Sequence, residues 1–174
     1  MREPIEPDPV STGVGKLVMH SLDGFLLPTP AMVDAIFHQA SIRLTPSSMK
    51  PTSAMTSTGY FVQHNATVDR QRSATDQRLG ALTAGQKKDV VLTRRLMSSR
   101  GKVAIYGWHR PNGKPIQPLS TVHGAQYADY SHGIRLVAGT AYVDGAARPL
   151  ADVLADPELA PIVSGEGPID NAPG

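Results

Sequence analysis

The chain has 174 residues, a length typical of one domain that buries a core without disulfides. Its formal net charge of +2 is too small to indicate a nucleic-acid-binding protein, and Lys and Arg form no dense run. The absence of cysteine excludes disulfides, thiolate nucleophiles and Cys-ligated zinc. The 16 glycines and 15 prolines indicate a loop-rich fold.

The ends of the chain differ in composition from its middle. The first residues, MREPIEPDPV, have no apolar core of a signal peptide, which leaves two alternatives, a cytoplasmic chain or an exported chain without its leader. Pro- and Gly-rich composition predicts an extended lead-in at 1–15 and a flexible tail at 164–174, around a single domain at 16–163. No run of about 18 apolar residues occurs, so no membrane span is expected.

Two segments have helix patterns. Thr29 can cap a helix that starts at Pro30, and a second helix is predicted from Pro149 to Asp156. In the first helix, apolar residues at helical spacing form one face: Met32, Val33, Ile36, Phe37 and Ala40. The polar stretch 64–80 is compatible with a solvated helix or a loop.

Short apolar runs between turn residues predict strands at 16–19, 41–44, 89–93, 102–107, 115–119, 133–137 and 140–143. The runs at 89–93 and 102–107 are expected to form one hairpin, and those at 133–137 and 140–143 another. The expected fold is α+β, an antiparallel sheet of about five strands packed against one or two helices.

Titratable and aromatic side chains concentrate between residues 87 and 137, around the string YADYSHGIRLV. Such a concentration beside short strands is typical of a binding or catalytic cleft. The candidate catalytic residues are His109, Ser120, His123, Asp129 and His132. The candidate substrate-binding residues are Lys88, Trp108, Tyr127 and Tyr130.

A metal site is one interpretation of this region. His123, Asp129 and His132 can hold a divalent metal such as zinc, with a fourth position open for a water whose pKa falls to about 7. On one continuous strand His132 would face away from the other two ligands. The metal hypothesis therefore requires a bend near Gly124 or Tyr130.

A metal-free interpretation uses a histidine as general base, Asp129 to orient it, and Ser120 or Ser131 as nucleophile. Ser131 would point away from its neighbour His132 on a strand, so Ser120 with His132 or His109 is the freer pair. A structural alternative is that Asp129 caps a turn and the histidines bond the backbone.

Two further pairs have alternative interpretations. Trp108 and His109 can form a stacking platform for a sugar or a peptide, or Trp108 can fill the core. Lys87 and Lys88 can bind an anionic group, or they are simply solvated at the start of a strand.

The blocks KKDVVLTRRL, KVAIYGWHRPNGKPIQPLS and YADYSHGIRLV resemble an uncharacterised bacterial protein family whose members are usually predicted to be exported. The segments LPTPAMVDAIFHQA and PLADVLADPELAPIVSGEGPI resemble other parts of the same family. This resemblance implies export but no activity. The order of elements is also similar to papain-like cell-wall peptidases, whose cysteine has only Thr29 or Ser21 in its place here, so that mechanism is excluded.

Three functions follow as hypotheses. The first is a hydrolase of a polymer such as a cell-wall peptide, a polysaccharide or an ester, centred on His109, His123, Asp129 and His132. The second is a non-enzymatic module that binds carbohydrate or a protein through exposed aromatic side chains. The third is a structural protein whose Pro- and Gly-rich ends dock into an oligomer.

Overall fold

The computed structural model describes residues 24–75 and 80–170. The predicted lead-in at 1–15, the predicted strand at 16–19 and the end of the predicted tail at 171–174 lie outside this part. The described part of the chain contains four helices and several small sheets, which confirms the predicted α+β class.

The helices are α2 (Pro30–Gln39), α3 (Thr58–Ser73), α4 (Leu150–Ala155) and α5 (Ala160–Val163), with 3-10 turns η1 (Ser53–Thr56) and η2 (Arg94–Ser98). The strands are β1 (Phe25–Leu26), β2 (Ile42–Arg43), β3 (Thr83–Ala84), β4 (Lys88–Val90), β5 (Ile105–His109), β6 (Pro115–Ser120), β7 (His132–Gly133), β8 (Val137–Ala138), β9 (Thr140–Val143) and β10 (Ala146–Pro149). None of these helices is long and apolar enough to cross a bilayer.

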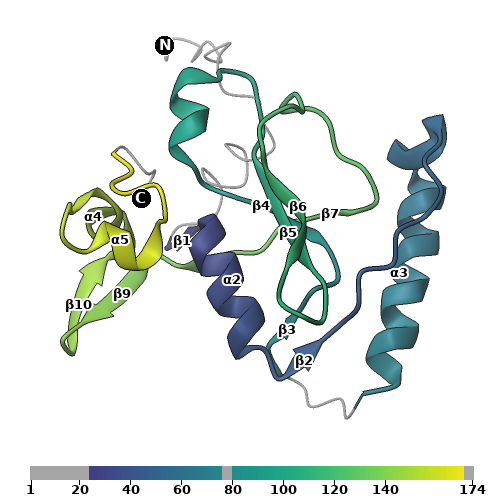
Figure 1. The fold of residues 1–174 in the computed structure, drawn as a ribbon, viewed down its shortest axis with the longest axis horizontal. Coiled ribbons are helices and arrows are strands. Elements are labelled where there is room, and N and C mark those ends of the chain that lie inside the picture. The colour runs from purple at the N-terminus through teal and green to yellow at the C-terminus, as the bar shows by residue number, and fades with distance from the viewer. Residues whose placement is uncertain (1–23, 76–79, 171–174) are drawn as a thin grey trace, which may run out of the picture.

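A four-stranded sheet in the order β6-β5-β4-β7 forms the centre of the molecule (Figure 1). β4 pairs antiparallel with β5, which confirms the first predicted hairpin, and β6 pairs antiparallel with β5. β7 lies parallel to β4, with His132 opposite Lys88. The expectation of about five antiparallel strands is matched only loosely, because this sheet has four strands and one parallel edge.

The second predicted hairpin is wrong. β8 pairs with β1, and β9 pairs with β10 across Asp144 and Gly145. These two residues have φ angles of 50° and 80°, as a two-residue Asp-Gly turn requires. The Asp-Gly pair thus determines the hairpin of β9 and β10. The strand before it, β8, pairs with β1, which is far away in the sequence.

The helix α2 forms as predicted and covers one face of the sheet. The backbone N–H of Met32 donates to the Thr29 side chain at 3.2 Å, which caps the helix N-terminus. Val33 on its buried face packs against Val91 and Ala104 of the sheet region. Because Val91 points toward α2, its neighbour in sequence Val90 points to the other face.

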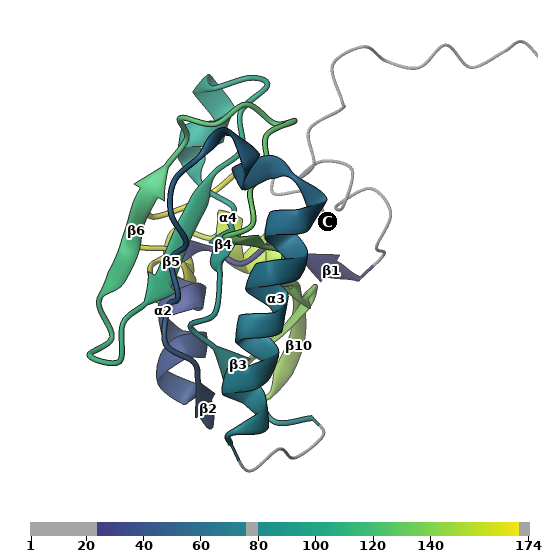
Figure 2. The same ribbon diagram turned by 90° about the vertical axis from the view of Figure 1, so that its right-hand side faces the viewer.

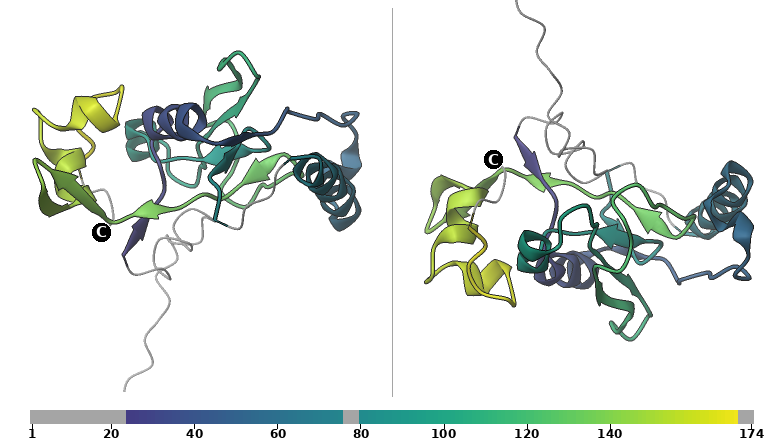
Figure 3. Two further views of the ribbon diagram at one scale, coloured as in Figure 1. Left: turned by 90° about the horizontal axis from the view of Figure 1, so that it is seen from below. Right: turned by 90° about the horizontal axis from the view of Figure 1, so that it is seen from above.

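α3 lies at one end of the molecule, and the hairpin β9–β10 with α4 and α5 lies at the other (Figures 1 and 3). Figure 2 looks onto α3 from its outer side. The polar stretch 64–80, for which a helix and a loop were both compatible with the sequence, is helical as far as Ser73, and residues 76–79 lie outside the described part. Its inward positions recur at helical spacing and are the least exposed of the helix: Tyr60, Phe61, His64, Thr67, Val68 and Gln71.

The chain remains packed beyond the predicted domain end at residue 163. Ile169 is buried, joins the core cluster that contains Leu154, and its N–H donates to the Leu154 carbonyl at 2.7 Å. Residues 164–170 thus follow the surface with an apolar anchor.

β5 contains an irregularity that decides where its side chains point. Its register with β6 shifts between Ile105 and Gly107, and both Gly107 and Trp108 have positive φ angles, 101° and 58°. The extra residue of this bulge lies in β6, between Gln117 and Ser120, and the positive φ angles disrupt the alternation of faces in β5. Tyr106 and His109, three residues apart, therefore both point toward α2, while Trp108 points to the opposite face.

Candidate functional site

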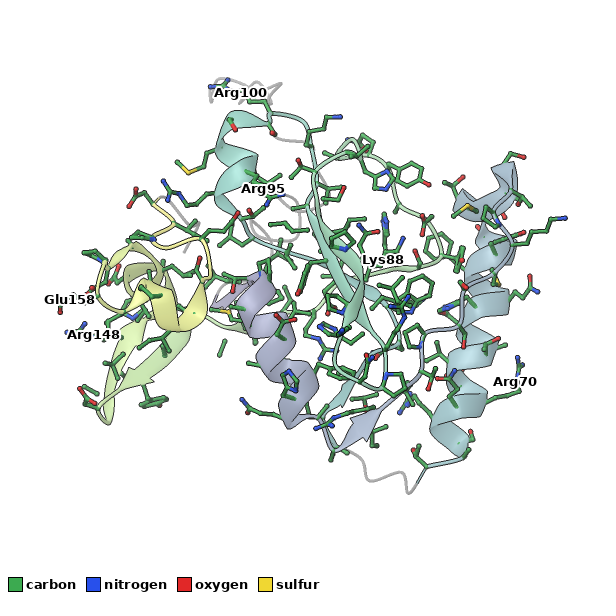
Figure 4. All side chains as sticks on the ribbon, viewed as in Figure 1. Arg70, Lys88, Arg95, Arg100, Arg148 and Glu158 are labelled. Atoms are coloured by element: carbon green, nitrogen blue, oxygen red, sulfur yellow. The ribbon has the colours of Figure 1, made fainter. Side chains whose placement is uncertain are left out.

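The loop between β6 and β7 brings several predicted site residues together on the sheet face opposite α2. We call His123, Tyr127, Asp129, His132 and Lys88 the His–Asp cluster. The His123 ring stacks on Tyr127 with centroids 4.3 Å apart and lies 5.5 Å from the His132 ring. Figure 4 shows Lys88 at the centre of the molecule, where β4 places it beside β7.

Asp129 is the buried anion of this cluster. Its Oδ1 accepts hydrogen bonds from the backbone N–H of Ser131 at 2.8 Å and from the Ser131 hydroxyl at 2.5 Å. Its Oδ2 accepts from the Tyr127 hydroxyl at 3.3 Å. Burial alone would raise the pKa of Asp129, but the Ser131 hydrogen bonds and the nearby His132 and Lys88 hold that pKa below its ordinary value. Asp129 is therefore ionised at neutral pH.

His132 is the neutral imidazole of the cluster. Its Nε2 lies 3.8 Å from Asp129 Oδ2, and its side chain is 6% exposed. Burial lowers the pKa of His132 to about 4, with Asp129 opposing the shift and Lys88 adding to it. Nε2 makes no hydrogen bond within the described part of the chain. His132 can thus accept or pass on a proton.

Aromatic and basic groups adjoin the cluster on its α3 side. The Lys88 ammonium lies 5.5 Å from the centre of the Trp108 ring, a cation–π contact. His64 is fully buried, 6.2 Å from Trp108 and 5.1 Å from Tyr130. Burial, with the Lys87 charge, lowers the pKa of His64 to about 4, so this ring is neutral as well.

An open pocket reaches the cluster. It measures about 290 Å³, and Tyr127 and His132 supply its polar wall. Its other walls are mostly apolar and come from α3, the sheet and the loop: Phe61, Val90, Val103, Ala128, Gly133 and Ile134. We call it the apolar pocket. His132 thus borders a cavity as well as the buried Asp129.

His109 lies apart from the His–Asp cluster. This position corrects its predicted grouping with His123 and His132. Its Nε2 lies 2.7 Å from Asp34 Oδ1 on α2, and its ring stacks on Phe37 at 4.7 Å. The Tyr106 hydroxyl donates to the same carboxylate at 2.9 Å. The positive φ angles of Gly107 and Trp108 are the physical reason, because they turn His109 toward α2.

The two serines considered as nucleophiles are placed differently. The Ser131 hydroxyl is buried and donates to Asp129, so it points away from any substrate. Ser120 ends β6, and its Oγ accepts from the Val122 N–H at 3.4 Å. Within residues 24–75 and 80–170, no hydrogen bond joins Ser120 to His109 or His132. Neither serine has the contact with a base that a nucleophile needs.

The burial of Trp108 and Tyr130 does not support a stacking role for either ring, and it favours the alternative that Trp108 fills the core. Trp108 is 4% exposed and Tyr130 is 3% exposed, so neither ring offers a face to a ligand. Tyr130 instead bonds the backbone of Met49 through its hydroxyl at 2.8 Å. Tyr127 is the aromatic side chain of the prediction that stays half-exposed.

The predicted metal set receives no support from this geometry. No group of three or more His, Asp or Glu side chains within the described ranges is arranged to hold a metal ion. Asp129 directs Oδ1 to Ser131 and Oδ2 to Tyr127, which leaves His123, Asp129 and His132 without a common centre.

Sequence reasoning missed Phe61 and His64 on α3 and Asp34 on α2. The spacing of Tyr60, Phe61, His64 and Val68 is a helical stripe and could have indicated an inward face. The contact of Asp34 with His109 spans 75 residues and left no local pattern.

Comparison of the chain with protein-family models, with curated proteins and with solved structures finds no match in any of the three. The resemblance to an exported bacterial family stays a prediction. The function therefore has to be argued from the site alone.

Proposed function

We propose that this chain is a hydrolase that acts on a polymeric substrate, such as a cell-wall peptide, a polysaccharide or an ester, at the His–Asp cluster. One observation carries the proposal: a neutral imidazole, His132, contacts a buried carboxylate and also lines an apolar pocket. A proton acceptor, a charge that supports it and a place for the substrate are what hydrolysis requires.

For an ester or a peptide bond, the groups have distinct roles. A water oxygen bonds to the substrate carbonyl carbon while one of its protons passes to the His132 ring. The carbonyl oxygen becomes an oxyanion, which the Lys88 ammonium stabilises. As the bond to the leaving group breaks, the imidazolium returns the proton to the leaving oxygen or nitrogen. Asp129 stabilises the transient imidazolium.

The rim of the site is formed by His123 and Tyr127. Their stacked rings lie beside His132, at 5.5 Å and 5.8 Å between centroids. The two rings shield one side of the His132 imidazole from water. A substrate reaches the imidazole through the apolar pocket. This arrangement favours a substrate with an apolar group next to the bond that is cleaved.

The test is a hydrolysis assay of the purified protein on peptidoglycan, on a soluble polysaccharide and on p-nitrophenyl acetate. For the substrate that is cleaved, His132→Gln should lower kcat/KM by about 10²-fold or more, because general base catalysis contributes about that factor. Lys88→Met should also lower the rate, since it removes the charge that stabilises the oxyanion.

The matched control is His38→Gln, which changes an exposed histidine on α2. It should leave kcat/KM unchanged, and thermal unfolding would establish that each variant is folded. Lack of cleavage of all three substrates by the native chain, or a folded His132→Gln variant with native activity, would refute the proposal.

A further inference from the structure

A second pocket lies on the other side of Gly133 and Ile134 from His132. It measures about 520 Å³, and it shares only these two residues with the apolar pocket. Its polar walls come from Gln86, Lys87, Asp89 and Arg135 and its apolar walls include Leu82 and Ile134. We call it the Arg135 pocket.

Two buried polar atoms in the walls of this pocket lack partners. The Nε of Arg135 and the Oε1 of Gln86 make no hydrogen bond within residues 24–75 and 80–170. Arg135 Nη2 donates to the Thr83 carbonyl at 2.9 Å, and Nε is 3.7 Å from Asp89 Oδ1, too far for a hydrogen bond. Buried polar groups are rarely left unpaired, so an unpaired donor and an unpaired acceptor in one pocket indicate a polar ligand.

The charges of the pocket favour an anion. Lys87 and Arg135 contribute two positive charges and Asp89 one negative charge, so the walls carry a net positive charge. The Lys87 ammonium donates to the Tyr130 carbonyl at 2.5 Å, so it attracts an anion in the pocket by its charge and not through a direct hydrogen bond. The Arg135 guanidinium is left as the group that can bind a carboxylate through its planar fork.

The apolar walls and the free acceptor narrow the ligand further. Leu82 is 40% exposed and Ile134 is 50% exposed, and both line the pocket. Gln86 Oε1 accepts a hydrogen bond, so the ligand should carry an N–H group as well as a carboxylate. An acylated amino acid with an apolar side chain has all three features.

We propose that the Arg135 pocket binds the carboxyl-terminal residue of a peptide. The carboxylate pairs with Arg135, the peptide N–H donates to Gln86 Oε1, and the side chain packs on Leu82 and Ile134. This site stands on its own contacts and does not depend on hydrolysis at the His–Asp cluster. If both sites act on one substrate, the carboxyl end of that substrate lies beside Gly133, the residue of β7 that follows His132.

The experiment measures binding by isothermal titration calorimetry with N-acetyl-L-leucine as probe. N-acetyl-L-leucine amide, which lacks the carboxylate, should bind at least about tenfold more weakly, a difference of about 1.4 kcal/mol. Inorganic phosphate should not compete well, because it has no side chain or N–H. Equal binding of the amide, or phosphate that binds as tightly as the probe, would overturn the proposal.

Three variants locate the binding. Arg135→Gln should reduce affinity about tenfold or more by removing the charged fork. Ile134→Asp places a negative charge at an exposed wall position, so the protein should fold while affinity for the probe falls. Ile162→Asp on α5 is the matched control, since Ile162 is 76% exposed and does not line the pocket. Native affinity in a folded Ile134→Asp variant would refute the site.

Asp89 provides a change in the opposite direction. Its carboxylate competes with the ligand for Arg135, so Asp89→Asn should bind N-acetyl-L-leucine several-fold more tightly than the native chain. Weaker binding by a folded Asp89→Asn variant would contradict the proposed carboxylate position.

Discussion

Two sets of the same three residue types lie on opposite faces of the sheet. In one, Asp34, Tyr106 and His109 face α2, and the imidazole is hydrogen-bonded to the carboxylate at 2.7 Å. In the other, the imidazole of His132 lies 3.8 Å from Asp129 and makes no hydrogen bond through Nε2 within the described part of the chain. The imidazole of the first set has its hydrogen-bond partner and supports the fold, whereas the imidazole of the second set can still form a hydrogen bond with a ligand.

Burial separates the two carboxylates as well. The Asp34 side chain is 42% exposed, so water shares in its solvation. The Asp129 side chain is 3% exposed and is held by Ser131, with the charges of two lysines nearby. The comparison shows that residue types alone do not identify a site. The two sets differ in which polar groups have hydrogen-bond partners within the described part of the chain and which do not.

The largest expected difference is in stability. Asp129→Ala should lower the free energy of unfolding by about 3 kcal/mol, because it leaves Lys87 and Lys88 without their buried counter-charge. Asp34→Ala should cost only about 1 kcal/mol, since an exposed carboxylate is screened by water. Urea denaturation of both variants measures the difference. Equal costs would show that the two carboxylates have the same role.

The next effect concerns pH. The pKa of His132 is about 4 in the folded chain and 6.5 when exposed, so between these values only the unfolded state binds the proton. The free energy of unfolding should therefore fall as the pH drops from 7 to 4.5, and His132→Gln should reduce this loss by about 2 kcal/mol.

The comparison with His38→Gln isolates this contribution. His64, whose pKa is also about 4, acts in the same direction, and Asp89, whose pKa burial raises to about 6, acts in the opposite one. Both are present in the native chain and in both variants, so their contributions cancel. A pH dependence of His132→Gln equal to that of His38→Gln would mean that His132 is exposed to water.

The smallest effect is expected for the two tyrosine hydroxyls. Tyr106→Phe removes a hydrogen bond of 2.9 Å to Asp34 and should lower the free energy of unfolding by about 1 kcal/mol. Tyr127→Phe removes a longer one of 3.3 Å to Asp129 and should cost about half as much. Thermal unfolding of the two variants would test this order. A reversed order would place the tighter network in the His–Asp cluster.

Sequence predicted the elements whose signals are local. Thr29 and Pro30 mark the start of α2 within two residues, and the predicted runs on either side of η2 overlap the strands β4 and β5. The pairing of β8 with β1 joins segments more than a hundred residues apart, and nothing in either segment specifies the other. The partner of a short strand is determined by tertiary packing.

The candidate site divides in the same way. His123, Tyr127, Asp129 and His132 lie within ten residues, so their closeness could be expected from the sequence. The contribution of α3 could not, because Phe61 reaches the apolar pocket from an element about seventy residues earlier. The position of His109 depends on backbone geometry that residue patterns do not show.

The left-handed backbone at Gly107 and Trp108 in β5 has a consequence for the evolution of this chain. With perfect alternation, the indole at position 108 and the phenol at 106 would project the same way, and the imidazole at 109 would project the other way. A substitution that returned these two residues to extended backbone would thus exchange the surroundings of two rings at once, placing an imidazole over Lys88 and an indole against Asp34. The backbone conformation of these two residues is therefore as constrained as the identity of any side chain in the strand.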